Sequence, residues 1–277
     1  MNYVVSQRAL DTIERECRGH PDTETGGILV GFRDGGQVAI THATGPGINW
    51  SRSAQHFVKD TEYLQTVLNL LFQYFQVNYL GVWHKHPEAM PYPSQGDVAS
   101  AMEEIDDHQV GLDELITPIC VMDASRVEVL PYVIRDNSYN AVSWRPVPHE
   151  TLGADGSLQT QWYTRSVGQA RLEKELEQFR ALGVEAEVRK GADQTYRFHV
   201  PLGAGSPVRL VMLCPAEYPV VPPEVAVYDS STRQYEPVNS PTLDDWNIFQ
   251  YLGDIVREFQ RNPPGVGAQE SGGASPG

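Results

Sequence analysis

Residues 80–97 read LGVWHKHPEAMPYPSQGD, and they place His84 and His86 one residue apart at the end of an apolar run. Such a run is typical of a buried β-strand. Residues two apart on a strand project from the same face, so the two imidazoles lie together and Lys85 points away from them. The stretch therefore predicts two aligned metal ligands at the end of a strand.

Asp97 is a candidate third ligand, because the ten residues between it and His86 allow the following helix to fold back over the strand end. Three protein ligands with an open fourth position are typical of catalytic zinc, whereas structural zinc usually has four ligands. A structural alternative stays open, since Ser94-x-x-Asp97 ahead of an apolar helix also fits a helix-capping box. Capping and metal binding are compatible, so the pattern alone does not choose between them.

The sequence around this stretch alternates helix and strand patterns, which predicts an α/β domain. Ala9, Ile13 and Cys17 fall on one helical face, and Asp34-Gly35-Gly36 separates two apolar runs as in a β-hairpin. Expected helices cover residues 6–19, 60–76 and 94–105, and expected strands cover residues 26–33, 37–44, 78–86, 117–123, 127–134 and 139–145.

A change of composition divides the chain. The sequence RPVPHETLGADGSLQ, residues 145–159, has two prolines, three glycine or serine breaks and no apolar periodicity, which is typical of a linker. We therefore expect a first domain at residues 1–147, a linker at 148–160, a second domain at 161–262, and a disordered tail rich in Gly, Pro and Ser at 263–277.

The second domain has the pattern of an α+β fold. Leu172, Leu176 and Phe179 form an apolar seam on a charged helix, and four short strands follow as a meander. The expected elements are helices at 168–182 and 244–260, strands at 184–190, 195–202, 207–213 and 223–228, and a proline-rich loop at 214–224.

The composition excludes some classes of function. A net charge of -15 and a pI near 4.9 disfavour nucleic acid as a partner, because binding to phosphate backbones relies on excess Lys and Arg. The three cysteines are odd in number and far apart, which fits neither a disulfide framework nor a cysteine-rich zinc site. No apolar run resembles a signal peptide or a membrane span, so we expect a cytoplasmic protein without a membrane partner.

The polar residues of the opening stretch stand at the spacing of a known motif. His84-x-His86-Pro87, followed after six residues by Ser94-x-x-Asp97, resembles the JAMM motif of MPN/JAB-domain zinc isopeptidases. The resemblance covers roughly the first 145 residues. It implies the MPN/JAB type of α/β fold, which is cytidine-deaminase-like.

The same family carries an upstream glutamate in the pattern Glu-x-x-Gly-x-x-x-Gly, and residues 24–31, ETGGILVG, fit this pattern. Taken alone, Glu24 reads as an ordinary exposed carboxylate. One departure from the family is Lys85, where Ser or Thr is common, but its side chain is expected on the opposite strand face from the ligands. Trp83 is expected in the core, because large aromatic side chains are usually well buried.

The resemblance implies a role for each of these residues. His84, His86 and Asp97 would hold Zn²⁺ as the cofactor. Glu24 would act as the general base for the attacking water and then as the general acid for the departing amine. Ser94 would donate its hydroxyl to the oxyanion of the tetrahedral intermediate.

The second domain, at residues 165–262, resembles the ubiquitin-conjugating enzyme (UBC) fold and its RWD relatives, with EYPVVPPEV at residues 217–225 as the characteristic loop. A conjugating enzyme needs a nucleophilic cysteine shortly after this loop, but residues 225–260 contain none, and Cys214 precedes the loop. The resemblance implies an inactive relative used for binding, and a generic α+β domain is the alternative. His199 is expected to face solvent or a partner.

Together the two resemblances imply a zinc metallopeptidase that cleaves the peptide or isopeptide bond after the C-terminal glycine of a ubiquitin-like protein. The implied partners are a ubiquitin-like protein or its conjugates, and the activating or conjugating enzymes of the same pathway. Two alternatives stay open. One is a peptidase that processes a sulfur carrier protein, and the other is a non-catalytic MPN scaffold.

Overall fold

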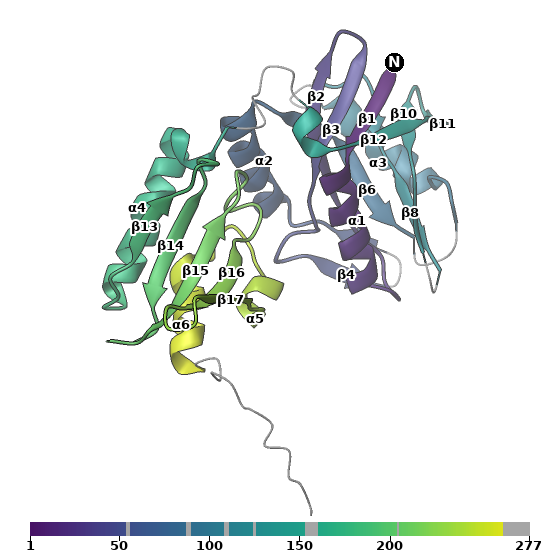
Figure 1. The fold of residues 1–277 in the computed structure, drawn as a ribbon. Coiled ribbons are helices and arrows are strands. Elements are labelled where there is room, and N and C mark those ends of the chain that lie inside the picture. The colour runs from purple at the N-terminus through teal and green to yellow at the C-terminus, as the bar shows by residue number, and fades with distance from the viewer. Residues whose placement is uncertain are drawn as a thin grey trace, which may run out of the picture. The chain divides into compact units, whose positions relative to one another are not determined.

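The structure, a computed structural model, describes residues 1–53, 56–86, 90–107, 111–123, 126–152, 160–203 and 205–262. The chain divides into two compact units, Met1–Thr160 and Gln161–Gly277, coloured purple to teal and green to yellow in Figure 1. Several sequence-based expectations lie outside the described residues, namely Pro87, the junction at 124–125 between two expected strands, most of the linker and the tail at 263–277.

The first unit is a mixed α/β structure built on one large curled sheet. Its helices are α1 (Gln7–Gly19), α2 (Thr61–Phe75) and α3 (Gln95–Asp106). Its strands are β1 (Asn2–Ser6), β2 (Thr25–Asp34), β3 (Gln37–Ala43), β4 (Ser51–Ser53), β5 (His56–Val58), β6 (Asn78–Lys85), β7 (Leu115–Ile116), β8 (Ile119–Met122), β9 (Val127–Leu130), β10 (Tyr132–Arg135), β11 (Ser138–Ala141) and β12 (Trp144–Val147).

The strand order of the large sheet is β11-β10-β7-β6-β2-β3-β1-β12, and β8 pairs with both β6 and β9. Strands β4 and β5 form a separate two-stranded sheet. The predicted hairpin is confirmed, because β2 and β3 pair antiparallel around Gly35-Gly36. Strands β8 and β9, which lie within the expected strands 117–123 and 127–134, pair antiparallel. This order puts β6, which contains His84 and ends just before His86, in the interior of the sheet.

Helices α1 and α3 contact different faces of this sheet. Adjacent residues on a strand point to opposite faces, and the neighbours Leu115 and Ile116 of β7 belong to different apolar clusters. Ile116 packs with Ile13 of α1, whereas Leu115 packs with Ala101 of α3. The sheet is therefore covered by α1 on one face and by α3 on the other.

A β-bulge interrupts the pairing of β6 with β2. Leu29 pairs with Gly81 and Val30 pairs with Tyr79, so Leu80 is an extra residue on β6. Gly81 has a φ of 153°, and a Cβ there would lie 2.0 Å from the carbonyl oxygen of Ile116. One extra residue reverses the alternation of side chains along a strand, so Tyr79 points to the same face as the histidines further along.

The start of the stretch without apolar periodicity, residues 145–152, is folded onto the first unit. Trp144–Val147 forms β12, which pairs with β1 in parallel, instead of belonging to the irregular stretch predicted from residue 145. Because β12 lies at the edge of the sheet, Pro146 is tolerated there. A 3-10 turn at His149–Thr151 follows, and His149 Nδ1 lies 3.0 Å from Ser6 Oγ.

The second unit is an antiparallel sheet with helices packed on it. Its elements are η3 (Trp162–Thr164), α4 (Ser166–Ala181), β13 (Glu187–Lys190), β14 (Tyr196–Pro201), β15 (Val208–Cys214), β16 (Glu224–Asp229), β17 (Gln234–Pro237), α5 (Pro241–Asp244) and α6 (Leu252–Arg261). The strands follow one another in sequence order from β13 to β17. Phe179 of α4 packs on Phe198 of β14 at the centre of its core.

Three sequence-based expectations for the second unit were wrong in part. The expected strand at 184–190 begins only at Glu187, and the four residues of β13 are all exposed. The alternation of half-buried and exposed residues holds only from Val184 to Glu187. Strand β17 was missed, because its four residues are all exposed and give no apolar signal. The final helix, expected from residue 244, begins at Leu252. In the stretch before it, the backbone N–H of Leu252 donates to Glu175, and the carbonyl oxygens of Ile248 and Gln250 accept from Arg171.

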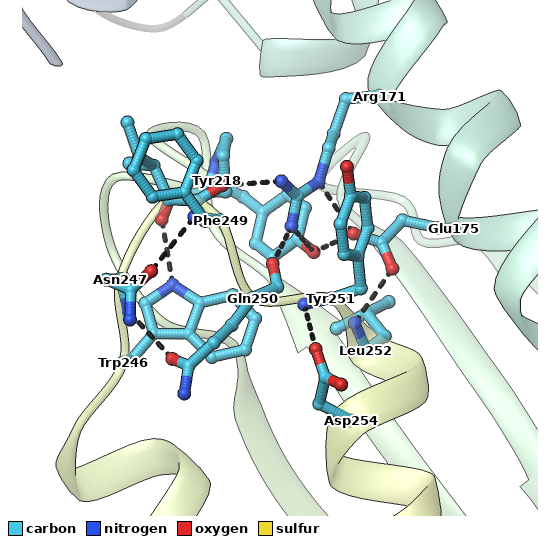
Figure 2. A network of polar contacts seen from close by, with 12 residues as sticks. Arg171, Glu175, Tyr218, Trp246, Asn247, Phe249, Gln250, Tyr251, Leu252 and Asp254 are labelled. Atoms are coloured by element: carbon cyan, nitrogen blue, oxygen red, sulfur yellow. Dashed lines mark hydrogen bonds and ion pairs between the residues drawn. The ribbon is translucent and has the colours of Figure 1, made fainter. Parts of the chain in front are cut away.

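Figure 2 shows the polar network that fixes this stretch before α6. Glu175 of α4 is fully buried, and it accepts hydrogen bonds from Arg171 Nε at 2.7 Å, from the backbone N–H of Leu252 at 2.8 Å, and from the Tyr218 hydroxyl. The guanidinium of Arg171 also lies 4.1 Å from the centre of the Tyr251 ring. The sequence predicted an apolar seam on α4 and missed this buried ion pair.

Candidate metal centre

Three potential metal ligands of the first unit converge on one point. Nε2 of His84 lies 2.8 Å from Nε2 of His86. The carboxylate of Asp97 reaches both rings, with Oδ1 3.2 Å from His84 Nε2 and Oδ2 3.4 Å from His86 Nε2. Both histidines are 8% exposed. The structure thus brings together the three residues that the sequence placed on a strand end and on the following helix.

The backbone of the histidine segment is held from two sides. On one side, β2 pairs with β6 so that Gly26 lies opposite His84 and Thr25 lies opposite Lys85. On the other side, the backbone N–H of His86 donates to the carbonyl oxygen of Cys120 at 3.1 Å. The two rings therefore project from a strand end that is fixed in the sheet interior.

Glu24 immediately precedes β2 and is half-buried. Thr25 pairs with Lys85, and the two strands are antiparallel. The residue before Thr25, Glu24, therefore lies opposite the residue after Lys85, His86. Their proximity has an electrostatic effect. Burial alone lowers the pKa of the His86 imidazole, but the pKa is raised overall by Asp97, by the carbonyl of Met90 and by Glu24.

The two glycines of the Glu24 pattern, Gly27 and Gly31, stand where the neighbouring backbone leaves no room for a side chain. A Cβ at Gly27 would lie 2.0 Å from the carbonyl oxygen of Thr44, and a Cβ at Gly31 would lie 1.9 Å from that of Ala39. Both distances are too short for any side chain. The two glycines therefore let β2 and β3 approach closely.

Asp97 and Ser94 also form a complete capping box at the start of α3. The backbone N–H of Asp97 donates to Ser94 Oγ at 3.1 Å, and the backbone N–H of Ser94 donates to Asp97 Oδ2 at 2.6 Å. The capping interpretation is thus confirmed, and it coexists with the approach of Asp97 to the histidines. Burial raises the pKa of the Asp97 carboxyl, but hydrogen bonds from His84 and His86 outweigh burial and hold this pKa well below its ordinary value.

The geometry of this donor set fits zinc. Ligand atoms held at about 2.0–2.2 Å around a tetrahedral zinc ion are about 3.3 Å apart, and the separations of 2.8, 3.2 and 3.4 Å differ from this by about half an ångström or less. His86 Nδ1 lies 2.9 Å from the carbonyl oxygen of Met90, which leaves Nε2 as the ligand atom. The sequence analysis missed this carbonyl, because no residue type signals a backbone acceptor.

Lys85 and Trp83 point away from the donor set, as predicted. Lys85 Nζ donates to the carbonyl oxygen of Pro21 at 2.8 Å, and Lys85 is only 1% exposed. Burial lowers the pKa of this ammonium group. Trp83 is also 1% exposed, and its indole N–H donates to the carbonyl oxygen of Thr44 at 2.9 Å. The face of β6 behind the histidines is therefore filled by core packing.

His199 of the second unit was expected at the surface and is instead 5% exposed. It lies on β14 between Glu187 of β13 and Val211 of β15, so neighbouring strands cover it on both sides. Burial lowers the pKa of its imidazole. Cys214 is fully buried, and burial raises the pKa of its thiol well above the ordinary value, which fits a core residue and not a nucleophile.

No helix among the described residues is long and apolar enough to cross a membrane.

The chain is similar to a known family and to known proteins. A family model described as prokaryotic homologs of the JAB domain matches residues 6–147. A curated relative, the CD-NTase/cGAS isopeptidase of Escherichia coli (strain TW11681), is 39% identical over 83 residues, which are 29% of this chain and 53% of that protein. The chain thus spans about half the length of this relative.

Among solved structures, the solution structure of protein DSY2949 from Desulfitobacterium hafniense is similar with a TM-score of 0.43 and 20% identity, over 53% of this chain and 93% of that chain. The family match covers just over half of the chain and contains all of the converging residues. The chain belongs to the family of prokaryotic homologs of the JAB domain.

Proposed function

We propose that this protein is a zinc-dependent isopeptidase of the JAMM type, which cleaves after the C-terminal glycine of a ubiquitin-like protein. The observation that carries the proposal is the convergence of His84, His86 and Asp97 at hydrogen-bonding distance, with Glu24 set against His86. The relative named as an isopeptidase supports the reaction class. Two histidines and one carboxylate leave an open position of the kind that catalytic zinc sites keep.

His84, His86 and Asp97 would hold the zinc ion. A zinc ion bound there supplies Lewis acidity, which makes water a nucleophile near neutral pH and polarises the scissile carbonyl. Glu24 would take the proton from the attacking water and later give it to the departing amine. Glu24 immediately precedes β2, and the first residues of β2 are held in place by pairing with β6. This fixed backbone suits a residue that transfers protons.

Ser94 is proposed to donate a hydrogen bond to the oxyanion. Its Oγ already accepts the backbone N–H of Asp97, and a hydroxyl can accept and donate at once, so the hydroxyl hydrogen remains available. The capping box orients this oxygen beside the ligand carboxylate. A preorganised donor of this kind is worth about 3 kcal/mol in the transition state.

The substrate is proposed to enter as an extended C-terminal tail. Such a tail binds well as an added strand, and glycines at its end allow the backbone to approach the catalytic groups closely. The segment from Gly45 to Ser53 is a candidate edge for this pairing. It leaves β3 next to the start of β2, where a Cβ at Gly27 would meet the carbonyl oxygen of Gly45 at 2.8 Å.

The test of the proposed function is cleavage of a ubiquitin-like protein with a diglycine tail fused to a reporter. We expect cleavage after the second glycine, loss of cleavage after treatment with a chelator, and recovery when zinc is restored. Cleavage that survives complete removal of metal would contradict the proposed chemistry. Fusions that carry a sulfur carrier protein, tested in parallel, separate the two substrate classes that the sequence leaves open.

The second unit is proposed to bind the modifier or a conjugation partner. An antiparallel sheet from β13 to β17 with packed helices is compatible with a UBC- or RWD-like domain. The burial of Cys214 and the lack of any cysteine between residues 225 and 260 support a non-catalytic role. We expect the full chain to retain a ubiquitin-like protein or a conjugating enzyme in a pull-down, and a chain shortened to residues 1–160 to lose it. Equal retention by both chains would remove the binding role.

A further inference from the structure

Three polar side chains of the first unit meet at Glu104, away from the metal ligands. The Tyr79 hydroxyl of β6 donates to Glu104 Oε2. Lys59 Nζ lies 3.2 Å from Glu104 Oε1, with side chains 28% and 34% exposed. Tyr79 of β6 thus contacts one oxygen of the Glu104 carboxylate, and Lys59, which follows β5, contacts the other.

The position of Glu104 on α3 relates it to the metal centre. Glu104 stands seven residues after Asp97, and seven residues are close to two helical turns, so both side chains project from the same face of α3. On β6, the bulge at Leu80 turns Tyr79 to the face that carries His84 and His86. Helix α3 and strand β6 are therefore joined twice across one interface, at the metal ligands and again about two turns further along α3.

Apolar packing holds α3 only weakly. Ala101 is its one buried residue among the twelve of the helix, and Val98, Met102 and Ile105 are partly buried. An alanine and three half-covered side chains give little resistance to sliding of the helix along the sheet. The hydrogen bond from the partly buried Tyr79 hydroxyl to the Glu104 carboxylate restrains the position of the helix, because hydrogen bonds are directional.

We propose that Glu104, together with Tyr79 and Lys59, is a positioning residue that fixes α3 so that Asp97 reaches the two histidines. The inference rests on the proposed function, because it assigns a purpose to the placement of a metal ligand. Lys59 extends the contact to the segment before α2, where Asp60 accepts the backbone N–H of Asn49 at 2.9 Å. The contact therefore links the base of the β4–β5 hairpin to the helix that carries the ligand.

The protonation of the phenol supports this arrangement. Burial and the neighbouring Glu104 carboxylate raise the pKa of the Tyr79 hydroxyl far above its ordinary value. The Tyr79 hydroxyl therefore stays protonated near neutral pH and can donate to Glu104.

The test uses the full chain with three variants, Tyr79→Phe, Glu104→Ala and Glu104→Gln. Zinc affinity is measured by competition with a chelating dye, and ligand geometry is measured from the visible spectrum of the cobalt-substituted protein. We expect Tyr79→Phe and Glu104→Ala to weaken zinc binding about 10-fold and to shift the cobalt bands, as loss of an outer partner does. In the zinc-saturated variants kcat should fall and KM should stay unchanged.

Glu104→Gln is the conservative variant. It keeps an acceptor for the Tyr79 hydroxyl and loses the charge that pairs with Lys59, so most of the zinc affinity and the wild-type cobalt spectrum should return. The control is Tyr139→Phe, which deletes the same oxygen from a tyrosine that is 40% exposed on the edge strand β11, and it should change nothing.

Two outcomes distinguish failure of the inference from failure of the proposed function. If wild-type protein binds no zinc or cobalt, the proposed function fails and the inference fails with it. If wild-type protein binds zinc, and the variants melt at a lower temperature but keep wild-type zinc affinity and cobalt spectra, the contact is only structural and the inference alone is overturned. Tyr79→Phe and Glu104→Gln are near-isosteric, so they decide the question even if Glu104→Ala does not fold.

Discussion

Replacement of Glu24 by glutamine is expected to abolish cleavage while zinc stays bound. The amide has nearly the shape of the carboxylate but cannot take a proton from water, so the loss should be the roughly 100- to 10,000-fold that a general acid–base group contributes. The proposed zinc ligands His84, His86 and Asp97 are unchanged by this substitution. Initial rates on a diglycine fusion and zinc content of the same sample measure the two effects separately.

The matched control for this variant is Glu14→Gln. Glu14 is an exposed carboxylate of the same unit that pairs with Arg18 on α1, and its substitution should leave both rate and zinc content at wild-type values. Normal turnover by Glu24→Gln would show that another group is the base. Loss of zinc along with activity would show that Glu24 belongs to the ligand set.

Replacement of Asp97 by asparagine is expected to remove zinc and activity without unfolding α3. An amide oxygen can still accept the backbone N–H of Ser94, so the capping box survives. As a metal ligand, however, a neutral amide is far weaker than a carboxylate. Zinc affinity should therefore fall by more than the roughly 10- to 100-fold that is lost when a residue hydrogen-bonded to a ligand is replaced. Zinc content and the melting temperature of metal-free protein distinguish ligation from capping.

Ser94→Ala is the complementary variant, because it removes the cap acceptor and keeps the ligand carboxylate. We expect it to bind zinc normally and to lose about 100- to 1,000-fold in kcat, which is the effect of deleting one oxyanion donor. The opposite pattern, in which Asp97→Asn keeps zinc and Ser94→Ala keeps activity, would leave only the capping interpretation of this pair.

Much of the first unit could be predicted from local pattern. The helical face of Ala9, Ile13 and Cys17 is buried as expected, and the hairpin of β2 and β3 forms where glycines separate two apolar runs. The converging histidines and Asp97 also follow from period and spacing, because a strand and a following helix allow few arrangements. The proximity of Glu24 came only through a family pattern, since nothing local links residue 24 to residue 86.

The parts that could not be predicted depend on non-local contacts. A bulge at Leu80 reverses the faces of β6 before it, and no residue type other than Gly81 marks it. Simple alternation puts Tyr79 and His84, five residues apart, on opposite faces of the strand. The contact of Tyr79 with Glu104 could therefore not be predicted from the sequence. The sequence also gives no signal for backbone acceptors such as the carbonyl of Met90, because every residue has a carbonyl.

The second unit shows the same limit. Glu175 looks like one of several exposed charges on α4, but it is fully buried because Arg171, Tyr218 and the start of α6 satisfy it. Helical periodicity continues through residues 244–260, yet the backbone N–H of Leu252, which a continuous helix would pair with the carbonyl of Ile248, donates to Glu175 of α4. Contacts with a distant helix therefore accompany the later start of α6.

The central claim is that His84, His86 and Asp97 hold a catalytic zinc ion. Metal analysis of the full chain purified without chelators tests it most directly, with Asp97→Asn purified in parallel. We predict one zinc per chain in the wild type and no stoichiometric zinc in the variant. Wild-type protein without stoichiometric zinc, or a variant that retains it, would contradict the claim.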